Sequence, residues 1–160
     1  MSKRRTIILS TFILILIAGA IGFYKFMTYD RKYNWSKEFE TEIKMVASDL
    51  EYNVVEVKEI KVENIKLPKE RALKLHILKT LSKIKITNYS KEFGQSIVLN
   101  SEDSTELVNC KGWCLGDHLI GIEIEYENID ENTLNKLKNS FKKQFVDYEI
   151  IWTQLKTRIK

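Results

Sequence analysis

The chain has 160 residues and a formal net charge of +4. Its first 29 residues contain four basic residues and no acid, so the remaining 131 residues hold 22 basic and 22 acidic side chains. A folded domain that binds nucleic acid normally carries a basic excess, so this balance excludes nucleic acid as an expected partner. The remaining length is sufficient for one domain with a hydrophobic core and short for two.

A long apolar run follows the basic residues at the N-terminus. Nineteen residues from Thr6 to Tyr24 carry no formal charge. As a helix they would be about 28 Å long, close to the ~30 Å hydrocarbon core of a bilayer. We therefore predict a transmembrane anchor over residues 6–27, after a cytoplasmic basic tail of residues 1–5. The competing interpretation is a signal peptide cleaved after Ala18-Gly19-Ala20, which matches the small-x-small pattern of cleavage sites.

Basic residues lie on both sides of the apolar run, so the positive-inside rule is nearly balanced. The N-terminal tail is very short, as in signal anchors, and large following domains are translocated with little regard to charge. We therefore predict a single-pass protein of the cell membrane, with its N-terminus in the cytoplasm and its C-terminal domain outside.

The next segment has apolar residues at helical spacing. Intervals of four, four, three and four residues separate Trp35, Phe39, Ile43, Val46 and Leu50. This is one stripe of an amphipathic helix, and we predict residues 28–51 as a stalk helix that offers a surface for self-association. Residues 52–67 are rich in β-branched side chains and predict one bulged strand or two short strands.

Pro68 is suited to the first turn of a further helix. The predicted buried stripe of that helix consists of Leu73, Ile77, Leu81 and Ile84. A short strand over residues 84–87 and a turn near Gly94 are expected next. Residues 96–100 and 105–109 then predict a hairpin.

The C-terminal third has the clearest pattern. Alternation of apolar residues with glutamates over residues 120–127 predicts a strand with one buried and one charged face. Asp130 is suited to cap a helix, and residues 146–155 return as a strand. The repeated strand, helix, strand order predicts one α+β domain over residues 52–160. Its expected sheet is mixed or antiparallel, with two or three helices, and the ferredoxin-like arrangement is one candidate.

The most specific local pattern is Cys110-Lys111-Gly112-Trp113-Cys114. Two cysteines in one tight loop of an exported chain predict a disulfide between Cys110 and Cys114. Such a clip would present Lys111, Gly112 and Trp113 as a rigid contact for a partner. In the alternative interpretation, Trp113 packs into the core.

Other chemistries fit the cysteine pair less well. A redox-active dithiol usually has two residues between its cysteines, whereas this pair has three. A zinc site would need Asp117 and His118 as further ligands. His118 is expected instead to be an ordinary surface or capping residue.

The sequence offers no pattern for catalysis. Glu123, Glu125 and Glu127 project from the same side of one strand, whereas acid and base carboxylates face each other across a cleft. We predict that this triplet is a solvated strand face. Nucleophile-elbow and phosphate-binding glycine patterns do not occur in the sequence. We expect a non-enzymatic protein without a metal or a cofactor.

Charge is sorted along the chain. Basic residues dominate from Lys58 to Lys91, and acidic residues dominate from Glu102 to Glu131. One interpretation is two solvated faces that attract each other in the fold. The other is an acidic surface that meets a basic partner.

Together these features predict a membrane-anchored domain outside the cytoplasm that binds another protein of a cell-envelope or membrane assembly. Two alternatives stay open. The first is a secreted binding module released by cleavage of the apolar run. The second is a small tethered immunity or inhibitor protein.

Overall fold

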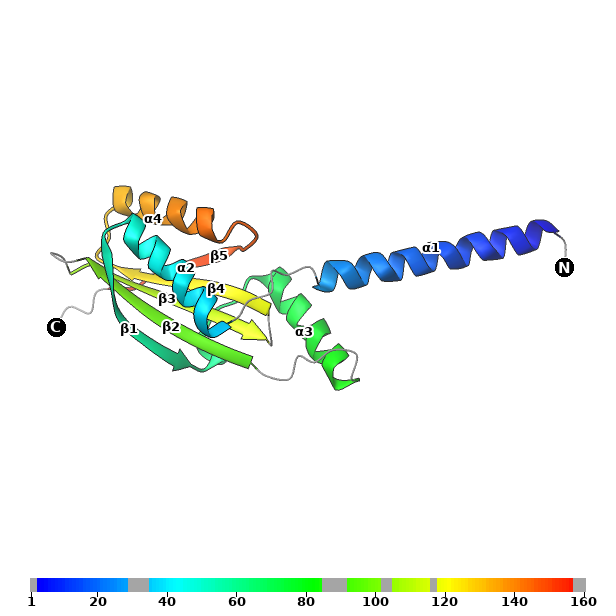
Figure 1. Cartoon of the computed structure of the whole chain (residues 1–160), viewed down its shortest axis with the longest axis horizontal. Coiled ribbons are helices and arrows are strands. Elements are labelled where there is room, and N and C mark those ends of the chain that lie inside the picture. Colours follow the sequence, from blue (N-terminus) through cyan, green and yellow to red (C-terminus); the bar gives the residue numbers. More distant parts are fainter. Residues whose placement is uncertain (1–2, 29–34, 85–91, 102–104, 116–117, 157–160) are drawn as a thin grey trace. The chain divides into compact units, whose positions relative to one another are not determined.

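The computed structural model describes residues 3–28, 35–84, 92–101, 105–115 and 118–156. The chain divides into two compact units, Met1–Asp30 and Arg31–Lys160. The helix α1 (Lys3–Thr28) lies in the first unit (Figure 1). The second unit is an α+β domain with a mixed sheet, as the sequence predicts.

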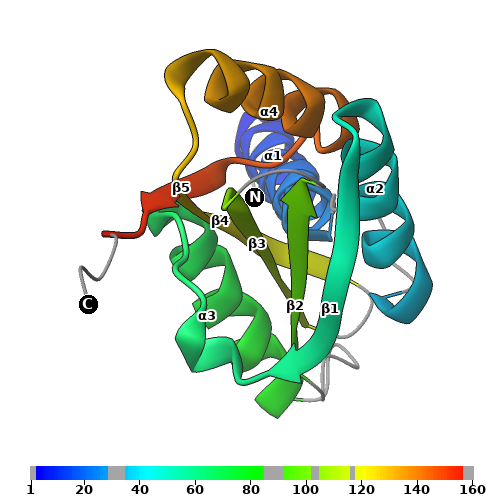
Figure 2. The same ribbon diagram turned by 90° about the vertical axis from the view of Figure 1, so that its left-hand side faces the viewer.

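The domain is built on a five-stranded sheet in which strands follow one another in chain order (Figure 2). The strands are β1 (Tyr52–Ile60), β2 (Glu92–Ser101), β3 (Leu107–Leu115), β4 (His118–Glu127) and β5 (Ile150–Gln154). Neighbouring strands are antiparallel, except that β4 and β5 are parallel. The described helices of the domain are α2 (Trp35–Asp49), the 3-10 helix η1 (Val62–Asn64), α3 (Lys69–Lys83) and α4 (Glu131–Gln144).

The ferredoxin-like candidate is wrong, because the two parallel strands are direct neighbours. In a split β-α-β arrangement another strand would lie between them. Here the connection through α4 is long enough to return the chain in the same direction, and β5 pairs directly with β4.

One face of the sheet is covered by α2 and α4, which enclose the main hydrophobic core (Figure 2). The predicted stripe of α2 is confirmed, since Phe39, Ile43 and Val46 are fully buried. The stalk interpretation of residues 28–51 is wrong. These side chains pack on the sheet, so α2 is part of the domain and its apolar stripe is not available for self-association.

The start of α4 has the predicted cap. The side chain of Asp130 accepts hydrogen bonds from the backbone N–H groups of Asn132 and Thr133, at 2.8 and 3.1 Å. The hydroxyl of Thr133 also donates to this carboxylate. Because these bonds favour the charged form, chiefly those from Thr133, they hold the pKa of Asp130 below its ordinary value. Leu137 and Phe141 then bury the inner side of the helix.

The opposite face of the sheet is partly covered by α3. The predicted stripe of this helix is wrong, because Leu73 and Ile84 are 63% and 60% exposed, whereas Leu75 and Leu78 are buried. A smaller set of buried apolar residues lies outside the main core cluster: Ile65, Leu75, Leu78, Trp113, Leu115 and Ile120.

Further expectations concern the strands and their turns. Of the two alternatives for residues 52–67, one bulged strand is observed, but its register shift lies between Val54 and Glu56 and not between Val57 and Ile60, where the alternation slips in the sequence. The strands β2 and β3 form the predicted hairpin with longer strands. The turn at Gly94 is wrong, because Gly94 lies within β2. A Cβ atom there would be 2.5 Å from the Ile60 carbonyl oxygen, so this close approach of β1 requires glycine.

The strand predicted over residues 84–87 falls largely outside the described residues. The strand predicted over residues 146–155 begins later than expected, since β5 begins at Ile150.

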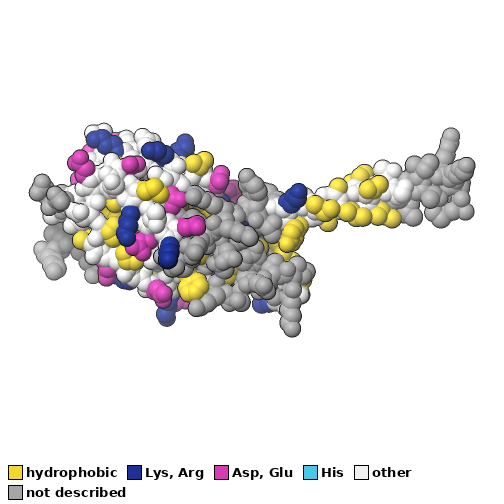
Figure 3. All heavy atoms as spheres, in the orientation of Figure 1, with side chains coloured by type: hydrophobic (Ala, Val, Ile, Leu, Met, Phe, Trp, Pro, Cys, Tyr) yellow, Lys and Arg dark blue, Asp and Glu magenta, His cyan; other side chains and the backbone are white. Residues whose placement is uncertain are grey.

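The part of α1 whose side chains are described carries many hydrophobic residues (Figure 3), and the large ones are exposed. Among the described residues, no helix combines the length and the apolarity needed to cross a membrane. The anchor predicted over residues 6–27 therefore gains no support from the structure and stays a prediction from the sequence.

The contact between α2 and β3 gives a test of this packing. A Cβ atom at Gly112 would lie 2.7 Å from Cζ of the fully buried Phe39 ring. We expect Gly112→Ala to lower the free energy of unfolding by about 1–3 kcal/mol, as overpacking of cores does. Gly121→Ala is the matched control, because its Cβ would meet only the tip of Leu67, at 3.2 Å. Urea denaturation of both variants measures the difference, and an equal loss in the two would contradict the packing described.

Candidate functional site

Polar side chains form two rows across the face of the sheet that α2 and α4 do not cover. Residues directly opposite each other in neighbouring strands share a face. The first polar row consists of Glu56, Val98, Asn109, Glu125 and Thr153. The second polar row consists of Lys58, Ser96, Lys111, Glu123 and Ile151. On β2, β3 and β4 the residues between the rows are Ile97, Cys110 and Ile124, which belong to the main core on the other face, so the rows follow there from strand alternation.

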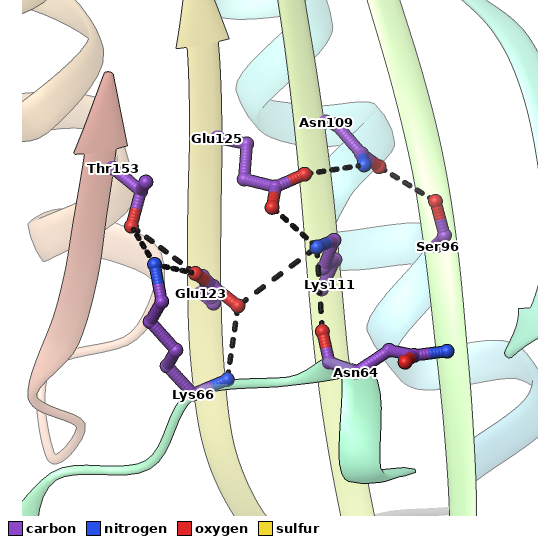
Figure 4. A network of polar contacts seen from close by, with 8 residues as sticks. All are labelled: Asn64, Lys66, Ser96, Asn109, Lys111, Glu123, Glu125 and Thr153. Atoms are coloured by element: carbon purple, nitrogen blue, oxygen red, sulfur yellow. Dashed lines mark hydrogen bonds and ion pairs between the residues drawn. The ribbon is translucent and has the colours of Figure 1, made fainter. Parts of the chain in front are cut away.

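Glu123 is the most buried charged group of the rows, with a side chain that is 1% exposed. Its Oε2 atom accepts a hydrogen bond from the backbone N–H of Lys66 at 2.9 Å. Its Oε1 atom accepts one from the hydroxyl of Thr153 at 3.1 Å and lies 3.3 Å from the Lys66 ammonium. This carboxylate therefore ties the segment before α3 to β4 and β5 (Figure 4).

Lys111 lies between the two carboxylates of β4. Its side chain is 13% exposed, and its ammonium donates to Glu125 and lies 3.9 Å from Glu123. It also donates to the backbone carbonyl of Asn64 at 3.3 Å. Two carboxylates so close together repel each other, and a cation between them compensates this repulsion.

The network continues toward β2 through neutral groups. Asn109 donates to Glu125 at 3.1 Å, and its carbonyl oxygen accepts from the Ser96 hydroxyl at 2.6 Å. The network thereby links the row residues of β2 to β5 that Figure 4 shows: Ser96, Asn109, Lys111, Glu123, Glu125 and Thr153. Every member of the first polar row is half-buried or exposed, so this row is accessible from outside.

The two carboxylates of β4 have their partners within the fold. Each of the two carboxylates is engaged with a lysine and with a neutral donor. Both project from one strand, as the sequence predicts, and do not face each other across a cleft. Within the described part of the chain, no group of three or more His, Cys, Asp or Glu side chains is placed to hold a metal ion.

The predicted loop around the cysteines is wrong, because Cys110 and Cys114 both lie in β3, which runs from Leu107 to Leu115. Four residues of extended strand span about 13 Å, whereas the Cα atoms of a disulfide lie within ~7 Å. Both thiols are accordingly free and buried, and the predicted disulfide does not form in this fold. Burial raises the pKa of both thiols.

The predicted contact residues are also strand residues. Lys111 belongs to the second polar row, Gly112 lies under the Phe39 ring, and Trp113 is only 9% exposed. The ammonium of Lys79 lies 6.0 Å from the centre of the Trp113 ring. The alternative interpretation, in which Trp113 packs inside, is the one observed. Asp117 and the side chain of His118 lie outside the described residues.

The sequence interpretation missed the polar rows. Glu123 was expected on a solvated face, whereas the segment before α3 buries it. One signal was available, because polar residues recur at period two on β3 and on β4, beside one polar residue of β2. These residues are Ser96, Asn109, Lys111, Glu123 and Glu125. Which of them meet depends on the register of the strands, and periodicity alone does not give the register.

Comparisons of the chain with protein-family models, with curated proteins and with solved structures give no match.

The burial of Glu123 can be tested by removing its charge. We expect Glu123→Gln to lower the free energy of unfolding by about 2–4 kcal/mol, because Lys66 and Lys111 lose a compensating charge. Glu127→Gln is the matched control, since Glu127 lies on the same face near the end of the same strand and is half-buried. The control is expected to change stability by less than about 0.5 kcal/mol. Equal effects in urea denaturation would show that the Glu123 carboxylate has no special structural role.

Proposed function

We propose that the chain is a single-pass membrane protein whose α+β domain lies outside the cytoplasm and binds another protein, without catalysing a reaction. The observation that carries the binding role is the first polar row, which is accessible and already ordered by the hydrogen bonds of Asn109 and Glu125. Ordered side chains lose little conformational entropy on binding, which favours recognition.

The row continues to the edge of the sheet. On β1, Glu56 and Lys58 are exposed and form an ion pair at 3.0 Å. Charged groups of both signs therefore lie on this face on β1, β3 and β4, and β2 contributes the uncharged Val98 and Ser96 between them. A partner protein with a complementary pattern of charges would bind this surface. Electrostatic complementarity of this kind increases the specificity of binding and the rate of association.

The anchor part of the proposal rests on the sequence alone. The uncharged run from Thr6 to Tyr24 follows three basic residues and has the length of a bilayer span. The proposed orientation places the N-terminus in the cytoplasm. A cleaved, secreted form remains the second candidate, because Ala18-Gly19-Ala20 matches a cleavage site.

The anchor can be tested on the protein as its cells produce it. We expect the intact mass of the protein to include the whole apolar run. We also expect the protein to stay with membranes at alkaline pH, because this treatment weakens electrostatic attachment and does not extract a helix that spans the bilayer. Mass spectrometry and sedimentation measure the two properties. A mature chain that begins at Ile21 would establish the secreted module in its place.

The binding surface can be tested by photo-crosslinking in cells. A photoreactive phenylalanine analogue at Val98, within the first polar row, is expected to form one dominant protein adduct. The control position is Val146, which is 75% exposed and lies after α4. The double variant Glu56→Lys, Lys58→Glu retains the internal ion pair and the net charge but reverses the pattern that a partner meets. Loss of the Val98 adduct in this variant supports the proposal, and the same adduct at Val146 or in the double variant contradicts it.

A further inference from the structure

The outward side of α3 combines apolar and basic side chains. Leu75 and Leu78 face the sheet and are buried. The opposite side carries an exposed stripe, here called the α3 stripe: Lys69, Leu73, His76, Thr80, Lys83 and the following residue Ile84. The spacing of three and four residues places these side chains on one side of the helix. Its large apolar members are exposed and both of its charged members are basic.

The charge of α3 differs from that of the domain as a whole. The helix holds five basic residues and one acid, whereas the chain after residue 29 is balanced. Arg71, Lys74 and Lys79 have partners in the fold. Arg71 donates to the carbonyl of Asp147, and Lys79 pairs with Glu92. The exposed basic groups of the stripe, Lys69 and Lys83, remain on its outward side.

This composition fits the surface of a lipid bilayer. Helices that lie in the membrane interface place Leu-type side chains among the headgroups, while lysines extend along the helix to reach the lipid phosphates. Anionic lipids add an electrostatic attraction for each basic residue near the surface. An acidic protein would satisfy the lysines but leave exposed apolar side chains to be matched separately.

The α3 helix lies near the start of α2, the helix that follows α1 in the chain. Phe39, one turn into α2, lies over Gly112 on one face of β3. Lys79 of α3 lies over the neighbouring Trp113 on the other face. The end of the sheet at which α2 begins is therefore the end that α3 covers. Only residues 29–34 separate α1 from α2 along the chain.

We propose that the α3 stripe binds the anionic phospholipid surface of the membrane that holds the anchor. Leu73 and Ile84 enter the headgroup layer, and Lys69 and Lys83 pair with lipid phosphates. The proposal rests on the anchor part of the proposed function. It adds a second membrane contact, which holds the domain in one orientation at the membrane.

The test uses the full chain in vesicles of phosphatidylglycerol and phosphatidylcholine in equal parts. A fluorophore is attached to Leu73→Cys and, in a second variant, to Ile84→Cys. The matched control is Val55→Cys, because Val55 is 60% exposed on β1. Cys110 and Cys114 are buried with raised pKa values, so the unsubstituted chain serves as the labelling blank.

Quenching by brominated lipid is expected to be several-fold stronger at Leu73 and Ile84 than at Val55, and quenching by aqueous iodide correspondingly weaker. Lys69→Glu with Lys83→Glu is expected to remove the difference, as are vesicles of phosphatidylcholine alone. Strong iodide quenching at Leu73 and Ile84 in the anionic vesicles would overturn the proposal. Protection of Leu73 and Ile84 from both quenchers that occurs in native membranes, but not in the lipid vesicles, would also overturn the proposal. It would indicate a protein partner for the α3 stripe. Flotation of the vesicles at alkaline pH reports on the anchor separately, so failure of the anchor and failure of the α3 contact are distinguishable.

Discussion

The second layer of this domain depends on the buried carboxylate of Glu123. A charged group that is removed from water is costly unless other charges and hydrogen bonds replace the water. Here the replacements come from two places, Lys111 in the sheet and the segment around Lys66 before α3. The carboxylate is compensated only when that segment lies on the sheet, so the ion pair and the position of α3 depend on each other. The hydrogen bond from the backbone N–H of Lys66 also fixes the path of the chain before α3, because a hydrogen bond depends on direction more strongly than an ion pair does.

The two faces of the sheet are covered by different means. On the first face, α2 and α4 enclose aromatic and aliphatic side chains, including Phe39, Phe141 and Phe145. On the second, a small apolar cluster lies under α3 and passes directly into the polar rows. A domain of this size needs most of its apolar surface buried, and the first face supplies most of it. The second face is therefore free to carry polar groups, and this is where a recognition surface has the least effect on stability.

Local spacing predicted part of this structure, and tertiary context decided the rest. The stripe of α2 and the Asp130 cap were predictable because each depends on residues within a few turns. In α3, leucines at 73, 75, 78 and 81 permit more than one buried stripe, and only packing on the sheet selects Leu75 and Leu78. The segment between the two cysteines was interpreted as a loop because it contains Gly112, and glycine is common in turns. In the fold it is a strand residue that admits the Phe39 ring. The meeting of Lys111 with Glu123 needs the register of two strands, which no local pattern contains.

The separation of basic and acidic residues along the sequence is related to this difference between the two faces of the sheet. One member of the central basic run, Lys66, pairs inside the fold with the acidic residue Glu123, which agrees with two regions that attract each other. The pairing is incomplete, because Lys69 and Lys83 point outward from α3 beside Leu73 and Ile84. A domain with no net charge thus retains one locally basic and apolar helix face. Net charge measures only the sum, whereas a membrane surface responds to the charge within about one Debye length, ~8–10 Å. The balanced composition that argues against nucleic acid as a partner is therefore compatible with a second contact between α3 and an anionic bilayer.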